Sequence, residues 1–345
     1  MSAPKILFIV DAGPTVGGGH AMRSLSLAAA LEAQGAACSF VTPPTVGHVL
    51  AAFAPGMAQV IAFSTEPRDL AKSAGGEAFD AVVFDHYGLS EREHLAIAQG
   101  RPALVIDDLA DRPLGADLVL DSGPARKAED YAGLAPDQAT LLLGPAYAPV
   151  RAEFAGLRDA ALAWRGEPVG RALVSLGLTD VGGITARVVE RLRPRIGEIG
   201  LDIVLGADAP SLAGLTKVAT RDPRLMLHVD TPHMARLTAE ADIAIGAAGS
   251  SVWERCTLGL PSAVVVLAEN QRPAARTLAE RGAALVLDAA QPDFDAVLDR
   301  ALMRLLTDVA LRRDLAAKSA EVCDGLGAPR VAEALLQLIA ARAPA

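Results

Sequence analysis

The fold is decided by the stretch Ile6-Leu-Phe-Ile-Val10, which leads through Asp11 and Gly17-Gly-Gly-His20 into the Ala- and Leu-rich segment Ala21 to Gln34. A continuous apolar run of this length is typical of a strand buried on both faces, as in a parallel sheet covered by helices. A glycine turn that joins such a strand to a helix is typical of an alternating α/β domain. We therefore expect a parallel sheet that includes this strand.

Strand-sized apolar runs of the same kind recur at residues 81–84, 103–106, 118–120, 172–176, 203–205, 243–245, 263–267 and 283–287. Helix-patterned segments lie between them, such as Thr185 to Leu192 and Ala274 to Arg281. The order of strand, glycine turn and helix begins again at Ala172, which predicts two Rossmann-like domains. We expect an N-terminal domain over residues 1–165 and a C-terminal domain over residues 166–345, whose last helix, Val331 to Ala341, could pack on the N-terminal domain.

Composition excludes several classes of protein. Of the 345 residues 51% are hydrophobic and 21% are charged, so the chain folds rather than remaining disordered. A net charge of −9 argues against a nucleic-acid or acidic-membrane partner, since both need a basic surface. Proline and glycine interrupt the longest stretch without Asp, Glu, Lys or Arg, Ala33 to Thr65, so it predicts no membrane span. The scattered Cys38, Cys256 and Cys323 form neither a disulfide framework nor a metal motif, which favours a cytoplasmic protein.

The first turn with chemical potential is Gly17-Gly18-Gly19-His20. Ligands of open α/β sheets bind at the carboxyl ends of strands, where glycine lets a ligand approach the backbone. His20 is expected in the first turn of a helix, where the helix dipole disfavours imidazolium and leaves the neutral form that a general base requires. The alternative is a glycine turn with an incidental surface histidine.

The second turn is Ala247-Ala248-Gly249-Ser250-Ser251, which lies between an apolar strand and a helical segment. Free backbone N–H groups and hydroxyls at a helix start can bind phosphate. Glu254, one turn further on, could accept hydrogen bonds from a ribose diol. The alternative is that Ser250 and Ser251 cap the helix and that Glu254 only favours its dipole.

Acidic residues follow two further strands, in Asp85-His86-Tyr87 and in Asp107-Asp108. A metal site built from Asp85, His86, Asp107 and Asp108 is conceivable, but the spacing matches no ligand motif. Aspartates at strand ends more often cap the next turn. We expect no metal and no cofactor.

These segments, in order along nearly the whole chain, resemble the PseG family, the UDP-sugar hydrolases of pseudaminic acid biosynthesis. The matching segments are residues 11–12, 17–23, 85–89, 105–112, 143–154, 245–256, 258–261, 269–271 and 324–328. The resemblance implies the GT-B fold of MurG-type glycosyltransferases, with two Rossmann-like domains whose parallel sheets face each other across a cleft. The chain departs from the family pattern at Ile9 and in Gly177 to Gly183, and both departures bear on the identity of the sugar.

By this resemblance the C-terminal domain holds UDP, with Gly249, Ser250 and Ser251 at the diphosphate and Glu254 at the ribose. The family's catalytic histidine falls on His20, which activates water for attack at the anomeric carbon, and UDP leaves with inversion. The remaining positions, which hold sugar or phosphate, are Asp11, Gly19, Tyr87, Arg151 and Asn270.

The expected activity is therefore metal-independent hydrolysis of a UDP-linked 2,4-diacetamido-2,4,6-trideoxyhexose. Two alternatives stay open. One is a GT-B glycosyltransferase, in which an acceptor hydroxyl replaces water, and the other is a non-catalytic protein that binds a nucleotide sugar. The expected partner is the UDP-sugar alone, without nucleic acid or stable membrane association, and a monomer is favoured.

Overall fold

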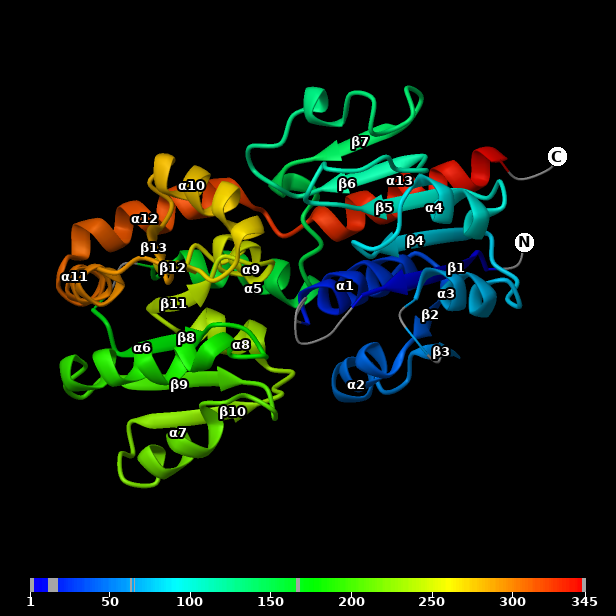
Figure 1. The fold of residues 1–345 in the computed structure, drawn as a ribbon. Coiled ribbons are helices and arrows are strands. Elements are labelled where there is room, and N and C mark those ends of the chain that lie inside the picture. The colour runs from blue at the N-terminus through cyan, green and yellow to red at the C-terminus, as the bar shows by residue number, and fades with distance from the viewer. Residues whose placement is uncertain (1–2, 12–17, 63, 65, 166–167, 343–345) are drawn as a thin grey trace. The chain divides into compact units, whose positions relative to one another are not determined.

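The computed structural model describes residues 3–11, 18–62, 64, 66–165 and 168–342, and the chain forms two compact units (Figure 1). Unit 1 comprises Met1–Ala152 and Leu326–Ala345, and unit 2 comprises Glu153–Gly325. The boundary between the units lies near residue 152 rather than 165, because the next helix, α5 (Ala152–Leu162), packs with unit 2. Within unit 2, Arg158 donates to the carbonyl oxygens of Thr257 and Cys323 at 2.5 and 2.9 Å.

Unit 1 is a seven-stranded parallel sheet in the order β3-β2-β1-β4-β5-β6-β7. Its strands are β1 (Lys5–Val10), β2 (Ala37–Thr42), β3 (Ala58–Ile61), β4 (Ala81–Asp85), β5 (Ala103–Ile106), β6 (Leu118–Asp121) and β7 (Thr140–Leu143). Its helices are α1 (Gly19–Ala33), α2 (Pro44–Phe53), α3 (Pro67–Ala74), α4 (Glu91–Ala98) and α13 (Gly327–Arg342), with short 3-10 turns at Ala128–Tyr131 (η1) and Pro145–Tyr147 (η2).

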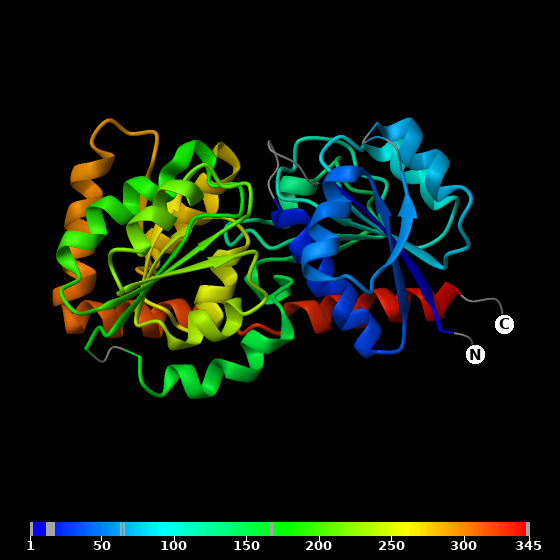
Figure 2. The same ribbon diagram turned by 90° about the horizontal axis from the view of Figure 1, so that it is seen from below.

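The apolar run of β1 is continuous because this strand is buried on both faces of the sheet. Ile6, Phe8 and Val10 pack on the face covered by α1, while Leu7 and Ile9 pack on the opposite face, and all five are fully buried. The last helix, α13, lies against α1 in both views of unit 1 (Figures 1 and 2), where its Val331, Ala332 and Leu335 join the same core. Both faces of this sheet are therefore covered, as the sequence pattern predicts.

Unit 2 repeats the arrangement with six parallel strands in the order β10-β9-β8-β11-β12-β13. The strands are β8 (Arg171–Ser175), β9 (Gly200–Leu205), β10 (Leu225–Val229), β11 (Ile243–Ala247), β12 (Ser262–Val266) and β13 (Leu285–Asp288). Its further helices are α6 (Ile184–Leu192), α7 (Leu212–Ala219), α8 (Met234–Glu240), α9 (Ser251–Thr257), α10 (Arg272–Glu280), α11 (Phe294–Thr307) and α12 (Val309–Val322), with 3-10 turns at Val181–Gly183 (η3), Arg193–Arg195 (η4) and Glu269–Gln271 (η5).

All nine predicted apolar runs coincide with strands, but four strands were not predicted, namely β2, β3, β7 and β10. Three of these four are edge strands, and an edge strand keeps solvent-exposed residues such as Gln59 and Met226 within its run. The fourth, β2, interrupts its apolar residues with Ser39. The stretch from residue 33 to residue 65 contributes β2, α2 and β3.

Two expectations from composition can be compared with the described residues. Among them, no helix is long and apolar enough to cross a membrane. Cys38, Cys256 and Cys323 are free thiols and all are buried.

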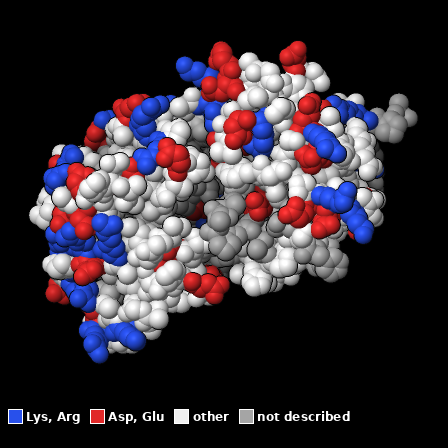
Figure 3. All heavy atoms as spheres, viewed as in Figure 1, with Lys and Arg blue, Asp and Glu red and all other residues white. Residues whose placement is uncertain are grey.

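On the face drawn in Figure 3, basic and acidic side chains are interspersed. In unit 2, for example, Arg191 on α6 pairs with Asp295 and Asp299 on α11.

Candidate active site

The switch point of the unit 1 sheet lies between β1 and β4, where the chain leaves the two strands toward opposite sides. Val10 and Asp85 are paired at the carboxyl ends of these strands, and the N–H of Asp11 donates to the Asp85 carbonyl oxygen at 2.9 Å. α1 begins at Gly19, which makes His20 the second residue of the helix. Doubly wound sheets bind their ligands at this position, so the fold places His20 where the sequence predicts it.

His20 is held by a buried carboxylate. Its Nδ1 lies 2.6 Å from Oδ1 of Asp85, which is fully buried, and His20 itself is only 6% exposed. His20 is therefore not a surface histidine. Because a carboxylate accepts hydrogen bonds, Nδ1 carries the proton of the neutral ring and the lone pair lies on Nε2.

Asp85 accepts three further hydrogen bonds. Nε and NH2 of Arg23 donate to its two oxygens at 2.7 and 2.5 Å, and the Ser24 hydroxyl donates to Oδ2 at 3.1 Å. Burial alone would raise the pKa of Asp85, but the Arg23 guanidinium and His20 overcome it and hold this pKa well below its ordinary value. Asp85 is thus an anion despite its complete burial.

A second carboxylate links the same arginine to Tyr87. The Tyr87 hydroxyl donates to Oδ1 of Asp108 at 2.6 Å, and NH1 of Arg23 donates to Oδ2 at 3.2 Å. The rings of Tyr87 and His20 meet edge to face, with centroids 4.5 Å apart and planes at 88°. Burial, and then the charge of Asp108, raise the pKa of Tyr87, so that its phenol remains a hydrogen-bond donor.

The structure thus brings Asp11, Gly19, His20 and Tyr87 to one edge of the unit 1 sheet, while Gly17 lies outside the described residues. Arg151 is half-buried directly before α5. Sequence reasoning missed the role of Arg23, Asp85 and Asp108 around the histidine. For Arg23 the sequence did contain a signal: it follows His20 by three positions, and residues three apart on a helix share a face.

The conceivable metal site of unit 1 is not formed. Among the described residues, no group of three or more His, Cys, Asp and Glu side chains could hold a metal ion. Nδ1 of His86 accepts from the N–H of Gly88 at 3.0 Å, and Oδ2 of Asp107 accepts from the N–H of Ala110 at 2.8 Å. Asp107 therefore caps its own turn, as strand-end aspartates commonly do.

The second predicted turn lies at the carboxyl end of β11 in unit 2. The N–H groups of Val252 and Trp253 bond to the carbonyl oxygens of Gly249 and Ser250, so the amides of Ser250 and Ser251 precede the first bonded turn of α9. Ser250 occupies the N-cap, yet its hydroxyl accepts no capping hydrogen bond from the described residues. The alternative that Ser250 serves as a side-chain cap is therefore wrong.

A buried arginine lies under this turn. Arg255 is 3% exposed, and it donates from NH1 to the Ser251 hydroxyl at 3.2 Å and from NH2 to the Ala247 carbonyl oxygen at 2.6 Å. Burial lowers the pKa of Arg255 to about 10. A Cβ at Gly246 would collide with the guanidinium, so glycine is needed at the end of β11 to let this side chain pass.

The other predicted residues of unit 2 border the same turn. Glu254 is half-buried in the first turn of α9. A Cβ at Gly249 would lie 3.7 Å from Nε2 of Gln271, which places η5, with the exposed Asn270, beside the turn. The chain therefore gathers Gly249, Ser250, Ser251 and Glu254 with the Asn270 segment at the switch-point side of its second sheet.

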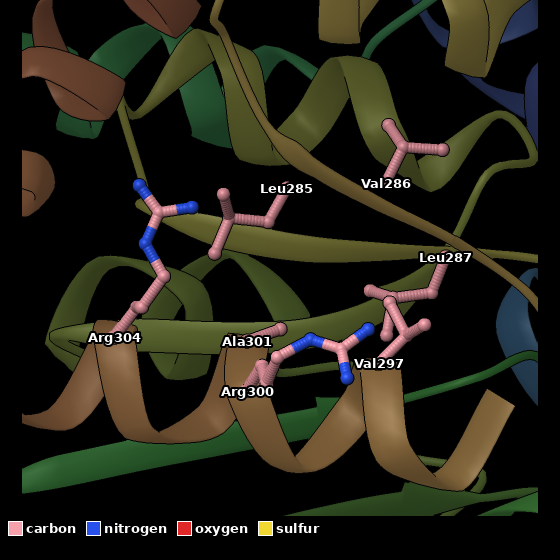
Figure 4. Close-up of a pocket in the computed structure, with 7 residues that line it drawn as sticks. All are labelled: Leu285, Val286, Leu287, Val297, Arg300, Ala301 and Arg304. Carbon is pink, nitrogen blue, oxygen red and sulfur yellow. The ribbon is translucent and has the colours of Figure 1, made fainter. Parts of the chain in front are cut away.

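A small hollow of unit 2 lies away from these residues. It is formed between β13 and α11 and is lined by Leu285, Val286, Leu287, Val297, Arg300, Ala301 and Arg304 (Figure 4). None of the residues predicted from the sequence lines it. We therefore assign the candidate site to the strand ends, where the polar groups converge.

Comparison with known proteins finds relatives of this chain. Residues 225–323 match the glycosyltransferase family 28 C-terminal domain, and this segment includes α9 and the turn before it. UDP-2,4-diacetamido-2,4,6-trideoxy-beta-L-altropyranose hydrolase of Campylobacter jejuni is 27% identical over 280 residues, which cover 81% of this chain and 97% of that protein. Spore coat polysaccharide biosynthesis protein SpsG of Bacillus subtilis is 28% identical over 57% of this chain and 56% of its own length.

Solved structures support the fold. MurG of Acinetobacter baumannii superposes with a TM-score of 0.66 at 18% identity, covering 97% of this chain and 99% of that one. The calicheamicin glycosyltransferase CalG4 superposes with a TM-score of 0.64 over the whole of both chains, also at 18% identity. The chain therefore has the GT-B fold of two Rossmann-like units, matches the family 28 C-terminal domain over residues 225–323, and is similar over 81% of its length to the PseG-type UDP-sugar hydrolase.

Proposed function

We propose that this protein hydrolyses a UDP-linked 2,4-diacetamido-2,4,6-trideoxyhexose to UDP and the free sugar, a reaction of pseudaminic acid biosynthesis. The observation that carries the proposal is the buried pair of Asp85 and His20, with Nδ1 2.6 Å from the carboxylate. Such a pair presents Nε2 as a base and stabilises the imidazolium that forms when this atom takes a proton. The similarity to the Campylobacter jejuni hydrolase supplies the substrate class.

In the proposed reaction, Nε2 of His20 takes a proton from water as its oxygen bonds to the anomeric carbon. The bond from this carbon to the diphosphate oxygen breaks at the same time, and its electron pair leaves with UDP. Attack from the side opposite the leaving group inverts the anomeric configuration. Asp11, Gly19, Tyr87 and Arg151 are assigned to the sugar and its phosphate.

The leaving group is assigned to unit 2. Backbone N–H groups and hydroxyls at Gly249, Ser250 and Ser251 offer donors to the diphosphate, and Arg255 beneath them adds a buried positive charge. Glu254 is assigned to the ribose hydroxyls, and Asn270 to the sugar or phosphate. These groups can take the diphosphate charge without a metal ion.

The test is to incubate the purified protein with a panel of UDP-diacetamido-trideoxyhexoses and no acceptor, and to follow the sugar by NMR. We expect one member to give UDP and free sugar, with inverted configuration immediately after cleavage. Since a general base contributes about 10²- to 10⁴-fold in rate, His20→Ala should lose about that much turnover while still binding UDP. Full turnover by His20→Ala would refute the assignment.

The second candidate is a glycosyltransferase, which the match to the family 28 C-terminal domain favours. The same base would then deprotonate an acceptor hydroxyl in place of water. UDP release that requires an added acceptor, with no free sugar formed, would identify this activity and exclude hydrolysis. Binding of a UDP-sugar without any release of UDP would instead indicate the non-catalytic binding protein.

A further inference from the structure

We propose that Arg23 is a positioning residue that joins His20 and Tyr87 into one unit through two carboxylates. The inference rests on the proposed function, because it assigns His20 the role of base. It concerns a residue that would not itself touch the substrate. Arg23 is 9% exposed and lies one helical turn after His20 on α1.

The guanidinium of Arg23 uses all three of its nitrogens on carboxylates. Nε and NH2 form a fork on the two oxygens of Asp85, at 2.7 and 2.5 Å, and NH1 reaches Oδ2 of Asp108 at 3.2 Å. The two aspartates lie at different strand ends of the sheet, since Asp85 is the last residue of β4 and Asp108 follows β5. A planar fork therefore sets the positions of both carboxylates relative to α1.

Each carboxylate in turn holds one ring. Asp85 lies 2.6 Å from Nδ1 of His20, and Asp108 accepts from the Tyr87 hydroxyl at 2.6 Å. The two rings touch edge to face at 4.5 Å. If the guanidinium moves, Asp85 moves with it and displaces His20. The same movement displaces Tyr87 through Asp108.

The charges of the four side chains in the cluster suit the proposed step, in which His20 takes a proton from water. Two carboxylates face one guanidinium, which leaves one excess negative charge while the imidazole is neutral. When His20 takes a proton from water, the charges of Arg23, Asp85, Asp108 and His20 balance. Arg23 thus keeps Asp85 ionised and oriented without cancelling the negative charge that stabilises the imidazolium.

Lysine is the diagnostic replacement, because it keeps the charge and loses the fork. An ammonium is a compact point charge and cannot form the paired bonds to Asp85 while also reaching Asp108. Since misplacement of a catalytic group by about 1 Å can cost about 10²-fold in rate, we expect Arg23→Lys to lower kcat about 10²-fold with KM changed by less than about threefold. Arg23→Ala should regain at least about tenfold of its lost kcat when guanidinium ion is added at a concentration below that which unfolds the protein.

The matched control is Arg171→Lys in unit 2. Arg171 forms the same kind of fork on a buried carboxylate, Asp202, but at the start of β8, away from the carboxyl ends of the strands. We expect this variant to keep the parent kcat. Asp108→Asn, at a partly exposed carboxylate, weakens the link between Arg23 and Tyr87 but leaves the fork of Arg23 on Asp85 in place, so it should give a smaller loss of kcat and serves if Arg23→Ala does not fold.

A readout independent of turnover completes the test, namely the imidazole nitrogen resonances of His20. The parent should show the tautomer protonated at Nδ1, and Arg23→Lys should show a mixture of both tautomers. A folded Arg23→Lys protein with kcat within about threefold of the parent would overturn the positioning role. If the parent releases no UDP from any UDP-sugar, the proposed hydrolysis is wrong, and unchanged His20 resonances in Arg23→Lys would then overturn the inference on their own.

Discussion

Replacing Asp85 by asparagine keeps the shape of the side chain and removes its charge. The parent carboxylate is fully buried and interacts with His20, with two nitrogens of Arg23 and with Ser24. An amide has only one oxygen to offer these donors, and its NH2 group would face Nδ1 or the guanidinium. The change therefore leaves a buried cation without its main counter-ion and removes the acceptor that sets the tautomer of His20.

The expected losses of stability and of turnover can both be estimated. Removing one partner of a buried ion pair costs about 3–5 kcal/mol of unfolding free energy. Asp108 still lies 3.2 Å from NH1 of Arg23 and offsets part of this loss, so we expect the lower end of that range. If the wrong tautomer removes the contribution of the base, turnover should fall about 10²- to 10⁴-fold, which corresponds to about 3–5 kcal/mol of barrier.

The stability loss should depend on pH in a defined direction. The carboxyl of Asp85 has its pKa lowered in the folded protein, so the unfolded chain takes up this proton first as the pH falls. The contribution of Asp85 is then fully present above about pH 5 and is lost as the pH falls below about 4 toward the folded pKa. The difference in unfolding free energy between the parent and Asp85→Asn should shrink as the pH falls below about 4 toward the folded pKa of Asp85.

The assay is urea unfolding followed by circular dichroism, together with UDP release from the UDP-sugar. Asp202→Asn is the control, because Asp202 is also fully buried and is held by an arginine and a histidine, Arg171 and His228, the latter at 2.7 Å. It should lower stability in unit 2 and leave turnover unchanged. Asp85→Asn with the stability of the parent at pH 7, or with its turnover, would refute the reasoning.

Three further outcomes are expected. Glu254→Ala should weaken UDP binding by about 1.5–3 kcal/mol, the worth of hydrogen bonds to a charged group, and equal affinity by calorimetry would reject the ribose role. Tyr131→Phe removes a buried hydroxyl that lies 2.9 Å from Asp107 and 2.8 Å from Asp121, so thermal unfolding should show a loss of about 1–3 kcal/mol with kcat unchanged. EDTA should not reduce UDP release, and a loss that added divalent metal restores would contradict the metal-independent site.

The fold was largely readable from local pattern. Strands buried on both faces, such as β1 and β11, are continuous apolar runs, and the turns after them carry glycine. Three edge strands, β3, β7 and β10, were missed because one side of each meets solvent and their composition is mixed, as in Leu225–Val229 with its exposed Met226. The helix starts at Gly19 and Ser251 fall where the glycine turns predict them.

The candidate site was readable only in part. Local sequence was enough to locate the two turns at the carboxyl ends of strands and to single out His20, Ser250, Ser251 and Glu254. It was not enough to show what surrounds the histidine. Asp85 and Asp108 were noted as strand-end aspartates without a link to His20, and Arg23 was noted only as part of a motif.

The alternation of buried strands and helices, and the turns between them, follow from residues close together in the chain, so the amino-acid sequence suffices to specify them. The partners of His20 follow from the order of strands in the sheet, which depends on packing between distant segments. Arg23 and Asp85 are 62 positions apart, and Tyr87 and Asp108 are 21 apart, yet all four meet because β1, β4 and β5 are neighbours. At that meeting point the guanidinium of Arg23 keeps a buried strand-end aspartate ionised beside a histidine, although burial alone would favour its neutral form.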